Sequence, residues 1–275
     1  MPTVDMLGVA RIMREVAAEE ILPRWRNLAA GDVRTKSKAG DLVTVADQAA
    51  EIALAHRLSD VLAGSRVIGE EAVAADPDVL QHFNRSEPVW IVDPIDGTRN
   101  FTEGGPTFDV MVGLVVAGRP VAGWIYAPAE DTLYMGEAGS GAEVHRATGI
   151  TPIEAPRHLE LSDFEGILGS NAFTMRGKPD PKSVSHMFRG YTRPTCAGHN
   201  YGRLLSGASQ FLINFSTHSW DHMPGIAIAT AAGFHAARHD GAPFDPLDRL
   251  GGVLVAPSPE TWEAIHALLL VGPMT

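Results

Sequence analysis

The residues most able to do chemistry lie in the stretch WIVDPIDGTRNF, which begins at Trp90. Two aspartates, Asp93 and Asp96, stand three positions apart directly after a run of strand-forming apolar residues. The proline between them biases Asp93 towards an extended backbone, and Gly97 permits a bend that other residues resist. Both carboxylates can therefore converge on one point, beside the Thr98 hydroxyl. Converging carboxylates repel each other unless a cation lies between them, and their hard oxygen atoms favour Mg²⁺ or Ca²⁺.

Other acidic residues lie at the ends of predicted elements. Glu70 and Glu71 follow a short strand in SRVIGEE, and Asp47 stands at the start of a helix, where N-capping is the ordinary explanation. Asp221 precedes Pro224 by three positions, and proline is favoured at the first position of a helix. Carboxylates at strand and helix ends in both halves of the chain fit a site between two layers or domains.

The elements that position these residues are predicted from hydrophobic periodicity and turn signals. The region 107–136 has short β-rich runs and turn signals typical of an antiparallel meander, and ATGITPIEAPRH after it is expected to be a connector. Both parts mix helices with strands, so we expect an α/β (α+β) protein with halves 1–147 and 148–275. The predicted helices span 4–29 (ended or kinked by Pro23), 46–63, 200–209, 223–232 and 259–270; the predicted strands include SRVIGEE, EPVWIVDP (stopped by Pro94), 167–170 and 210–215.

Composition narrows the function classes. The chain has 275 residues, enough for two domains or one large one at about 150 residues per domain. Its formal charge of −11 argues against a nucleic-acid-binding surface, although bound metal ions can still attract an anionic substrate. The single cysteine, Cys196, forms no internal disulfide and suits a reducing compartment. Without a signal-peptide pattern or a membrane-length apolar run, we expect a cytoplasmic protein that does not bind membranes.

Several motifs together resemble one protein family. WIVDPIDGTRNF is similar to the first signature of the inositol monophosphatase family of metal-dependent phosphatases, and SWDHMPGIAIATAAG is similar to its second signature. KSKAGDLVTVADQAAE, VIGEE, AGSGA and GAPFDPLDR match further family landmarks in the correct order, from about residue 33 to the C-terminus. The resemblance implies a layered αβαβα sandwich of the inositol monophosphatase and fructose-1,6-bisphosphatase type, which usually forms a homodimer.

The same resemblance implies a lithium-sensitive phosphomonoesterase that uses two or three Mg²⁺ ions and a metal-activated water to hydrolyse a small phosphorylated metabolite. Glu70, Asp93 and the backbone carbonyl of Ile95 match the ligands of one ion. Asp93, Asp96 and Asp221 match the ligands of a second. Glu70 is also expected to take part in catalysis, and Asp96 is expected to contact the substrate.

Other positions match the water- and phosphate-handling groups of the family. Asp47 and Thr98 match a pair that orients and helps deprotonate the attacking water, and the backbone N–H groups of Gly97 and Thr98 match those that hold the phosphate. Lys36 matches a lysine near the metal cluster, with an ordinary solvated lysine as the alternative. Glu71 is expected to support this cluster structurally.

The leaving-group side departs from the family pattern. Gly198 is retained, but His199 and Asn200 follow it where inositol-handling members have a G-T-A-A segment. Asn214 stands where those members carry a glutamate that binds sugar hydroxyls, and His222 lies within the altered second signature. We therefore expect Gly198, His199 and Asn214 to contact the substrate, with surface or capping roles as the alternative for His199 and His222.

Several other functions are alternatives to an inositol-phosphate phosphatase. Histidinol phosphate and 3′(2′),5′-bisphosphate nucleotides are alternative substrates within the family, and a scaffold or partner of the transcription machinery is the non-enzymatic alternative. A haloacid-dehalogenase phosphatase is disfavoured because its D-x-D-G-T motif lacks the extra residue found here, and an EF-hand lacks support in the spacing. D-P-x-D-G-T alone would also fit a plain turn with an aspartate capping a helix over 97–101.

Overall fold

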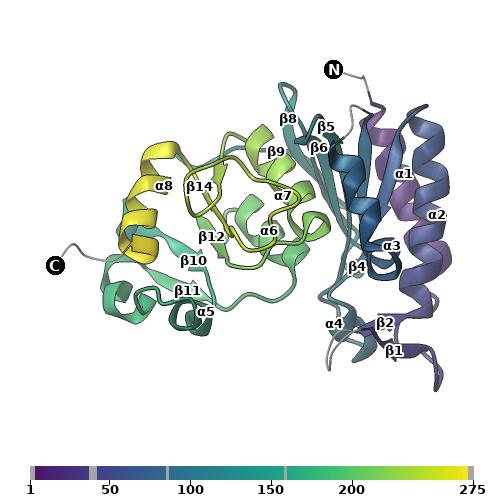
Figure 1. Cartoon of the computed structure of the whole chain (residues 1–275), viewed down its shortest axis with the longest axis horizontal. Coiled ribbons are helices and arrows are strands. Elements are labelled where there is room, and N and C mark those ends of the chain that lie inside the picture. Colours follow the sequence, from purple (N-terminus) through teal and green to yellow (C-terminus); the bar gives the residue numbers. More distant parts are fainter. Residues whose placement is uncertain (1–3, 37–41, 85–86, 158–159, 272–275) are drawn as a thin grey trace.

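The computed structural model describes residues 4–36, 42–84, 87–157 and 160–271, and it arranges them in five layers (Figure 1). A pair of helices covers one face of a large sheet, a second pair lies between this sheet and a smaller one, and the last helix covers the far face of the smaller sheet. The predicted αβαβα sandwich is confirmed. The five helices are α1 (Met6–Val16), α2 (Val45–Val61), α6 (Ala197–Leu205), α7 (Ser219–Ala231) and α8 (Pro259–His266).

The large sheet has seven strands within the described ranges, in the order β3-β4-β5-β6-β7-β8-β9. Only β3 and β4 run parallel, and the predicted antiparallel meander is confirmed in β5 to β7. The connector prediction needs correction, because the segment that we expected to link the halves includes β9, which pairs with β8. The strands are β3 (Arg66–Gly69), β4 (Val89–Asp96), β5 (Asp109–Val116), β6 (Arg119–Ala127), β7 (Thr132–Glu137), β8 (Gly141–Arg146) and β9 (Gly149–Ile153).

The smaller sheet has the order β11-β10-β12-β14-β13 among the described residues and mixes parallel with antiparallel pairs. The strand predicted at 167–170 is β10, which lies slightly earlier in the sequence, at Glu165–Ile167. The other strands are β11 (Gly190–Thr192), β12 (Phe211–Asn214), β13 (His235–Ala237) and β14 (Val253–Ala256); β1 (Val33–Thr35) and β2 (Leu42–Thr44) form a separate hairpin.

Short helical segments complete the chain. The predicted helix over 4–29 is shorter in the structure, because α1 continues as η1 (Ala17–Ile21) and ends in turns before and around Pro23. The other segments are α3 (Glu70–Ala75), η2 (Pro77–Asn84), α4 (Thr98–Thr102), η3 (Leu161–Asp163), α5 (Ser170–Met175), η4 (Pro181–Met187) and η5 (Ala267–Val271). In the part of the chain that the structure describes, no helix has the length and apolar character needed to cross a membrane.

The irregular end of β4 explains how the two aspartates of the motif meet. The sequence predicts that Pro94 stops the strand, but β4 continues to Asp96. Opposite it, Asp93 pairs with Met111 and Asp96 pairs with Asp109, so β4 has one more residue than β5 over this interval. In a regular strand, residues three positions apart point to opposite faces of the sheet. The extra residue shifts the alternation by one position, so the two side chains can point to the same face. The bulge therefore lets Asp93 and Asp96 converge.

Close packing of α7 on the large sheet brings the remaining aspartate to the same place. A Cβ atom on Gly123 would lie 2.2 Å from the Pro224 carbonyl oxygen, so only glycine permits this approach. The helix was predicted to begin near Pro224, but it begins at Ser219, and Pro224 lies inside it. The proline removes only the hydrogen bond to the carbonyl one turn earlier. Asp221 consequently lies in the first turn of α7.

Candidate active site

A cavity of about 970 Å³ lies between the ends of β3 and β4 on one side and the start of α7 on the other. The two halves of the chain therefore both contribute to it. Its size suits a small-molecule site, for which pockets typically measure roughly 300–1,000 Å³. Its acidic lining residues are Glu70, Glu71, Asp93, Asp96 and Asp221, and Lys36 and Thr98 lie among them.

Asp93, Asp96 and Asp221 form the centre of this cavity. Each offers a carboxylate oxygen, and these three atoms lie within 4.8 Å of one another. Asp93 Oδ1 is buried and has no hydrogen-bond partner among the described residues. Burial and neighbouring carboxylates raise the pKa of Asp93 and of Asp221 well above the usual range. A hard divalent cation fits this arrangement, because it would neutralise these crowded carboxylate oxygens.

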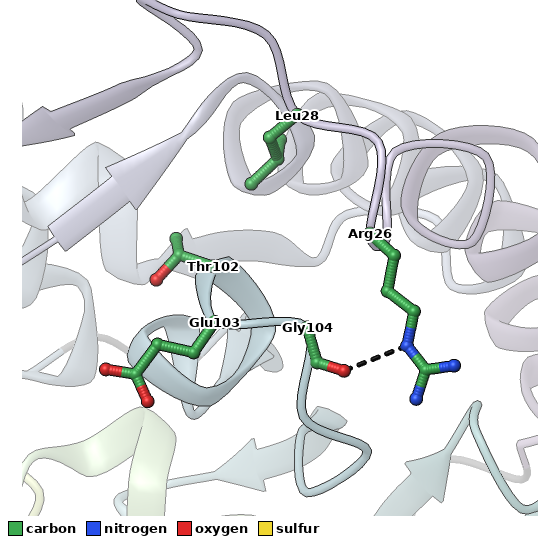
Figure 2. Close-up of a pocket in the computed structure, with 5 residues that line it drawn as sticks. All are labelled: Arg26, Leu28, Thr102, Glu103 and Gly104. Carbon is green, nitrogen blue, oxygen red and sulfur yellow. Dashed lines mark hydrogen bonds between the residues drawn. The ribbon is translucent and has the colours of Figure 1, made fainter.

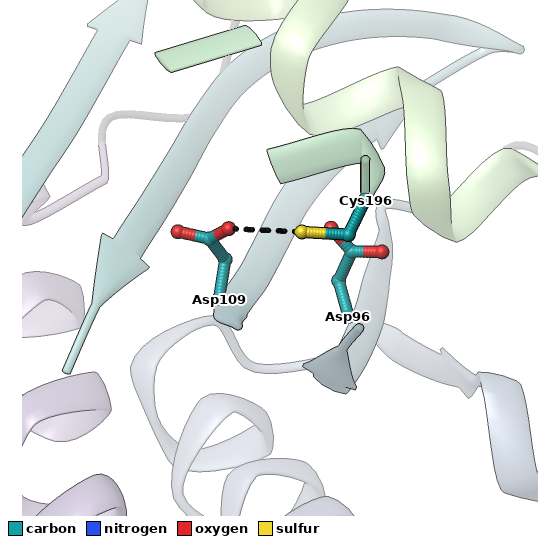
Figure 3. A group of neighbouring side chains, drawn as sticks. All are labelled: Asp96, Asp109 and Cys196. Carbon is teal, nitrogen blue, oxygen red and sulfur yellow. Dashed lines mark hydrogen bonds between the residues drawn. The ribbon is translucent and has the colours of Figure 1, made fainter. Parts of the chain in front are cut away.

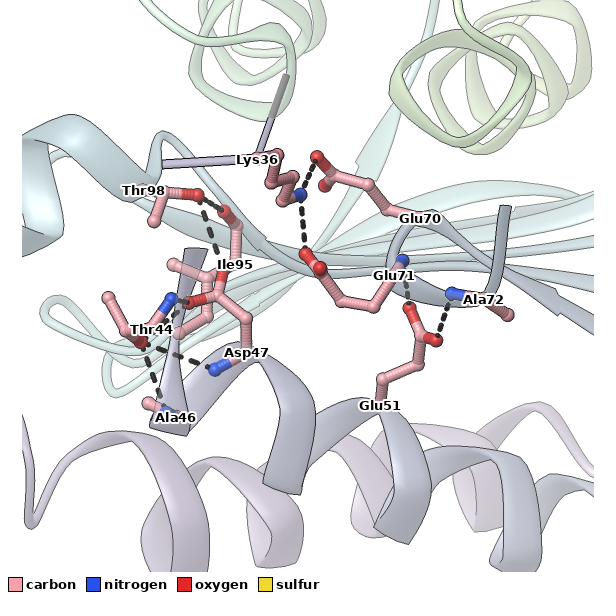
Figure 4. A network of polar contacts seen from close by, with 10 residues as sticks. All are labelled: Lys36, Thr44, Ala46, Asp47, Glu51, Glu70, Glu71, Ala72, Ile95 and Thr98. Carbon is pink, nitrogen blue, oxygen red and sulfur yellow. Dashed lines mark hydrogen bonds and ion pairs between the residues drawn. The ribbon is translucent and has the colours of Figure 1, made fainter. Parts of the chain in front are cut away.

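Lys36 bridges the two glutamates at the start of α3 (Figure 4). Its Nζ atom lies 2.7 Å from Glu70 Oε1 and 2.5 Å from Glu71 Oε1, and the lysine side chain is only 10% exposed. Burial alone would lower the pKa of Lys36, but the two carboxylates outweigh that effect and raise the pKa above its usual value. The alternative of a solvated surface lysine is therefore wrong. Residues 37–41 of the same motif lie outside the described residues.

Asp47 and Thr98 meet as predicted, although the local helix start differs from the expectation (Figure 4). Thr44, not Asp47, is the N-cap of α2. Asp47 Oδ2 accepts hydrogen bonds from Thr44 N at 2.8 Å and Thr44 Oγ1 at 2.5 Å. Its other oxygen lies 3.2 Å from Thr98 Oγ1, which is also 3.1 Å from the Ile95 carbonyl oxygen. Burial raises the pKa of Asp47 to about 6, despite the opposing hydrogen bonds from Thr44.

Gly97 occupies the sharp turn between β4 and α4. Its φ of 89° lies in the left-handed region, where side chains are strained, and a Cβ atom would lie 3.0 Å from the Thr107 carbonyl oxygen. The turn starts α4 at Thr98, so the short helix expected over 97–101 is present as Thr98–Thr102, with Gly97 rather than an aspartate at its N-cap. The first N–H groups of a helix have no partner within the helix and can bind an anion.

Asp109 is a buried carboxylate beside Asp96 that sequence reasoning missed (Figure 3). Its only early signal is an aspartate at the start of the apolar run DVMVGLVV. Asp109 Oδ2 lies 3.6 Å from Cys196 Sγ, and burial followed by the charge of Asp96 raises the pKa of Asp109 well above the usual range. The raised pKa favours the neutral acid, which limits the charge next to Asp96.

Gly198 lies behind the acidic centre. Its N–H donates a 2.5 Å hydrogen bond to Asp96 Oδ2, and a Cβ atom on it would lie 2.6 Å from Asp109 Cβ. Burial raises the pKa of Asp96 to about 6, while the Gly198 N–H acts in the opposite direction. The glycine therefore acts on Asp96, and its role as a direct substrate contact stays a prediction.

The other predicted substrate residues do not line this cavity. His199 is half-buried on α6, and Asn214 is half-buried at the end of β12. His222 is buried in the core, with Nδ1 3.2 Å from the Tyr201 hydroxyl, and burial lowers its pKa to about 3. The core position of His222 fits neither of the two roles weighed for it, a substrate contact or a surface or capping residue, and the roles of His199 and Asn214 stay predictions. From the C-terminal half of the chain, the residues that line the cavity besides Asp221 are His218, Trp220 and Arg249.

A smaller hollow of about 450 Å³ lies beside Arg26 and Gly104 (Figure 2). The Arg26 guanidinium stacks 4.1 Å from the Trp25 ring centre and donates to the Gly104 carbonyl at 2.9 Å. Glu103 is the acidic residue that lines it. Converging acidic groups are found instead in the larger cavity, which we take as the candidate active site.

Glu51 is a second residue that sequence reasoning missed. It is buried on α2, and its two carboxylate oxygens accept hydrogen bonds from Glu71 N and Ala72 N, each at 2.8 Å (Figure 4). A Cβ atom on Gly69 would lie 2.1 Å from Glu51 Cδ, so the glycine leaves room for this carboxylate. Glu51 thereby ties the start of α3, and with it Glu70, to α2.

Replacing Glu51 with glutamine should loosen this connection. One carboxylate oxygen becomes an NH₂ group that faces a backbone N–H, so one buried donor loses its partner at a cost of about 1–3 kcal/mol. We expect a lower unfolding temperature and a higher Mg²⁺ concentration for half-maximal activity. Thermal unfolding and Mg²⁺ titration measure these effects, with exposed Glu15→Gln as the matched control. Unchanged values for both quantities would contradict the role of Glu51.

Several known proteins are similar to this chain over most of its length. Bovine inositol monophosphatase 1 is 31% identical over 230 residues, which cover 79% of this chain and 78% of that protein. Human inositol monophosphatase 2 is 32% identical over 232 residues, covering 78% and 74% of the two chains. The structure of the Thermotoga maritima IMPase matches with a TM-score of 0.75 at 22% identity, covering 93% of this chain and 94% of that one, which shows the shared fold. The family model described as "Inositol monophosphatase family" matches residues 5–270, and the chain belongs to this family.

Proposed function

We propose that this protein is a Mg²⁺-dependent phosphomonoesterase that acts on a small phosphorylated metabolite resembling an inositol phosphate. The observation that carries the proposal is the convergence of Asp93, Asp96 and Asp221, with one buried oxygen of Asp93 that no described residue hydrogen-bonds. Family membership supports the reaction class, because the curated relatives named above are inositol monophosphatases.

The residues of the cavity suit two, or with a further ion three, Mg²⁺ sites. Glu70, Asp93 and the Ile95 carbonyl would hold one ion, and Asp93, Asp96 and Asp221 would hold another. When bound, the ions supply charge neutralisation and activation of water for an in-line displacement at phosphorus. Lys36 keeps Glu70 and Glu71 close together, so the first of these carboxylates stays directed towards the cavity.

Other groups of the chain bind the phosphate and orient the water. The N–H groups of Gly97 and Thr98 lie at the start of α4, where they can donate to phosphate oxygens. The Thr98 hydroxyl can donate a hydrogen bond to Asp47 and accept one from the attacking water. When the water gives its proton to Thr98 Oγ1, the original hydroxyl proton would pass to Asp47, so the threonine stays neutral. Asp47 is itself held by two hydrogen bonds from Thr44, so the acceptor has a defined position.

The same proposal includes the oligomeric state, the location in the cell and the response to other metal ions. We propose a cytoplasmic homodimer that binds neither nucleic acid nor membranes, and inhibition by Li⁺ through competition for a metal position. Ca²⁺ should bind without supporting full turnover, because it prefers looser and higher coordination than Mg²⁺. Full activity with Ca²⁺ as the sole divalent ion would contradict the proposed geometry. Light scattering of the purified protein tests the dimer.

Substrate identity is the part of the proposal that needs a panel of compounds. Solved structures of a related IMPase-II from Staphylococcus aureus are described with inositol monophosphate bound and with 2′-AMP bound. Histidinol phosphate and 3′(2′),5′-bisphosphate nucleotides are the alternative substrates. A scaffold or transcription partner would have no need for converging acidic groups, which argues against that alternative. Absence of phosphate release with every compound of the panel would argue for it.

We expect inositol 1-phosphate to be a substrate but not the best one. Asn214 provides one neutral acceptor where a glutamate would provide a charged one, and loss of a charge-assisted hydrogen bond costs on the order of 1 kcal/mol or more. Asn214→Glu should therefore raise kcat/KM for inositol 1-phosphate about tenfold relative to histidinol phosphate, a 3′-phosphonucleotide and fructose 1,6-bisphosphate. Exposed Asn27→Glu is the matched control. A wild-type preference for inositol 1-phosphate of roughly a hundredfold would refute this expectation.

A further inference from the structure

The cavity extends beyond the groups that would hold the phosphate. One wall of this extension comes from α3 and η2 and is apolar, with Val73, Pro77 and Leu80 among its residues. Further lining residues come from the start of α7 and from the loop before β14, where Trp220 and Arg249 lie. A substrate whose phosphate lies at the acidic centre would therefore have its leaving group in a part of the cavity that offers both apolar side chains and an arginine.

Arg249 is held in position at this rim. Its Nη2 lies 2.8 Å from His218 Nε2, and because arginine can only donate, the histidine nitrogen must accept. The His218 ring in turn packs against the Trp220 ring, with 4.6 Å between their centres and a tilt of 35° between their planes. The backbone is also fixed, since the Arg249 carbonyl accepts a hydrogen bond of 3.1 Å from Thr217 N.

The loop that carries Arg249 is braced by the neighbouring aspartate. Asp248 Oδ1 accepts from Leu250 N at 3.0 Å and from Gly251 N at 2.9 Å. Its other oxygen lies 3.0 Å from Arg238 Nη1. The carboxylate of Asp248 is therefore committed to its own loop, so it is not the partner of Arg249.

Among the described residues, no carboxylate compensates the charge of Arg249. The ion pairs recorded for the described residues include none between Arg249 and a carboxylate within 4.0 Å. Nη2 is bonded to His218, and the remaining N–H donors of the exposed guanidinium have no recorded hydrogen bond to the described residues. In a chain with a formal charge of −11, such a fixed cation beside a cavity attracts anions locally.

We propose that Arg249, held by His218, binds a second anionic group on the leaving-group side of the substrate. This inference rests on the proposed phosphomonoesterase function and specifies its substrate class. The preferred substrates would then be phosphomonoesters that carry an additional carboxylate or phosphate, which agrees with the expectation that inositol 1-phosphate is a substrate but not the best one. The planar fork of arginine suits either group, because both accept two parallel N–H hydrogen bonds.

Matched substrate pairs test the proposal. 3-Phosphoglycerate and glycerol 3-phosphate differ in having a carboxylate or a neutral CH₂OH group, and fructose 1,6-bisphosphate and fructose 6-phosphate differ in having a second phosphate. The quantity measured is the ratio of kcat/KM for the anionic over the neutral member. We expect Arg249→Ala to lower this ratio about tenfold or more for at least one pair, mainly through KM. Arg249→Lys should lower it less, because lysine keeps the charge but loses the fork.

The control is Arg11→Ala, which removes the same charge from an exposed side chain on α1. Its ratios should match those of the wild type. Ratios that do not respond to Arg249→Ala in either pair would overturn the proposal, and the pair that responds identifies the second anion as carboxylate or phosphate.

If the wild type hydrolyses none of these compounds and none of the wider panel that includes inositol 1-phosphate, the proposed function fails, but the anion site can still be judged. Calorimetric binding of 3-phosphoglycerate and of fructose 1,6-bisphosphate in Mg²⁺ would then be compared between wild type and Arg249→Ala. At least tenfold weaker binding to the variant supports the site, and equal affinity overturns it.

Discussion

Asp93→Asn should lower the turnover of phosphomonoesters by several orders of magnitude while the protein still folds. Asp93 lies between the positions proposed for both cations, so the loss of its charge weakens both sites at once. A thousandfold loss corresponds to about 4 kcal/mol of transition-state stabilisation. The measurement is kcat at saturating Mg²⁺, with circular dichroism to verify folding. A variant that hydrolyses its substrate at nearly the wild-type rate would show that the metal site is misplaced.

The same substitution should stabilise the metal-free protein. Burial and the neighbouring acidic groups raise the pKa of Asp93 in the folded state, so the folded chain retains a proton that the unfolded chain releases. Stability therefore falls as pH rises above the unfolded pKa of about 3.9 and through the folded pKa. Asparagine removes this penalty, so in EDTA at neutral pH the variant should unfold at a higher temperature. The difference should vanish near pH 4, and a variant less stable than wild type at pH 7 would contradict the explanation.

Asp47→Asn should reduce kcat by about 10²–10⁴-fold, the usual range for loss of a positioned acid or base. The carboxylate accepts from Thr44 with one oxygen and contacts Thr98 with the other. Because Thr44 N can only donate, an asparagine should keep its oxygen towards Thr44 and turn its NH₂ group towards Thr98, so the Thr98 hydroxyl loses the acceptor that orients it. Mg²⁺ binding should change little, because Asp47 is proposed to act on the water.

Mg²⁺ titration and the pH dependence of kcat separate this role from a purely structural one. Asp60→Asn, near the other end of α2 and exposed, serves as the matched control. Thr98→Ala should resemble Asp47→Asn, and the double variant should lose little more activity than either single one, since the two residues act as a unit. A large rise in the Mg²⁺ requirement of Asp47→Asn would instead make Asp47 a metal ligand.

Much of the acidic centre was predictable from the sequence, because its residues lie in short motifs. In WIVDPIDGTRNF the strand, the proline and Gly97 are local features, and they determine where Asp93 and Asp96 can point. The bulge that joins them in space was less predictable, since a strand period of two places residues three apart on opposite faces. Pro94 was consequently taken as the end of β4, whereas the strand continues through it.

The buried residues that support the acidic centre, Glu51 and Asp109, could not be predicted from the sequence for a different reason. Glu51 looks like any polar residue on a helix, and its burial becomes apparent only when the start of α3 docks against α2. Asp109 is one acidic residue in an apolar strand, and its neighbours Cys196 and Gly198 come from the other half of the chain. No local pattern encodes a contact between such distant segments.

Sequence alone therefore determined the residue types of the acidic centre, the mixed α/β class and the family, because these depend on local spacing and on the order of motifs. Tertiary structure decided how far apart these groups lie and which side chains hold them. It moved His222 into the core and placed Arg249 at the rim of the cavity through its contact with His218. The physical reason is that packing between distant elements, such as the close approach of α7 to Gly123, sets positions that no periodicity within one element can specify.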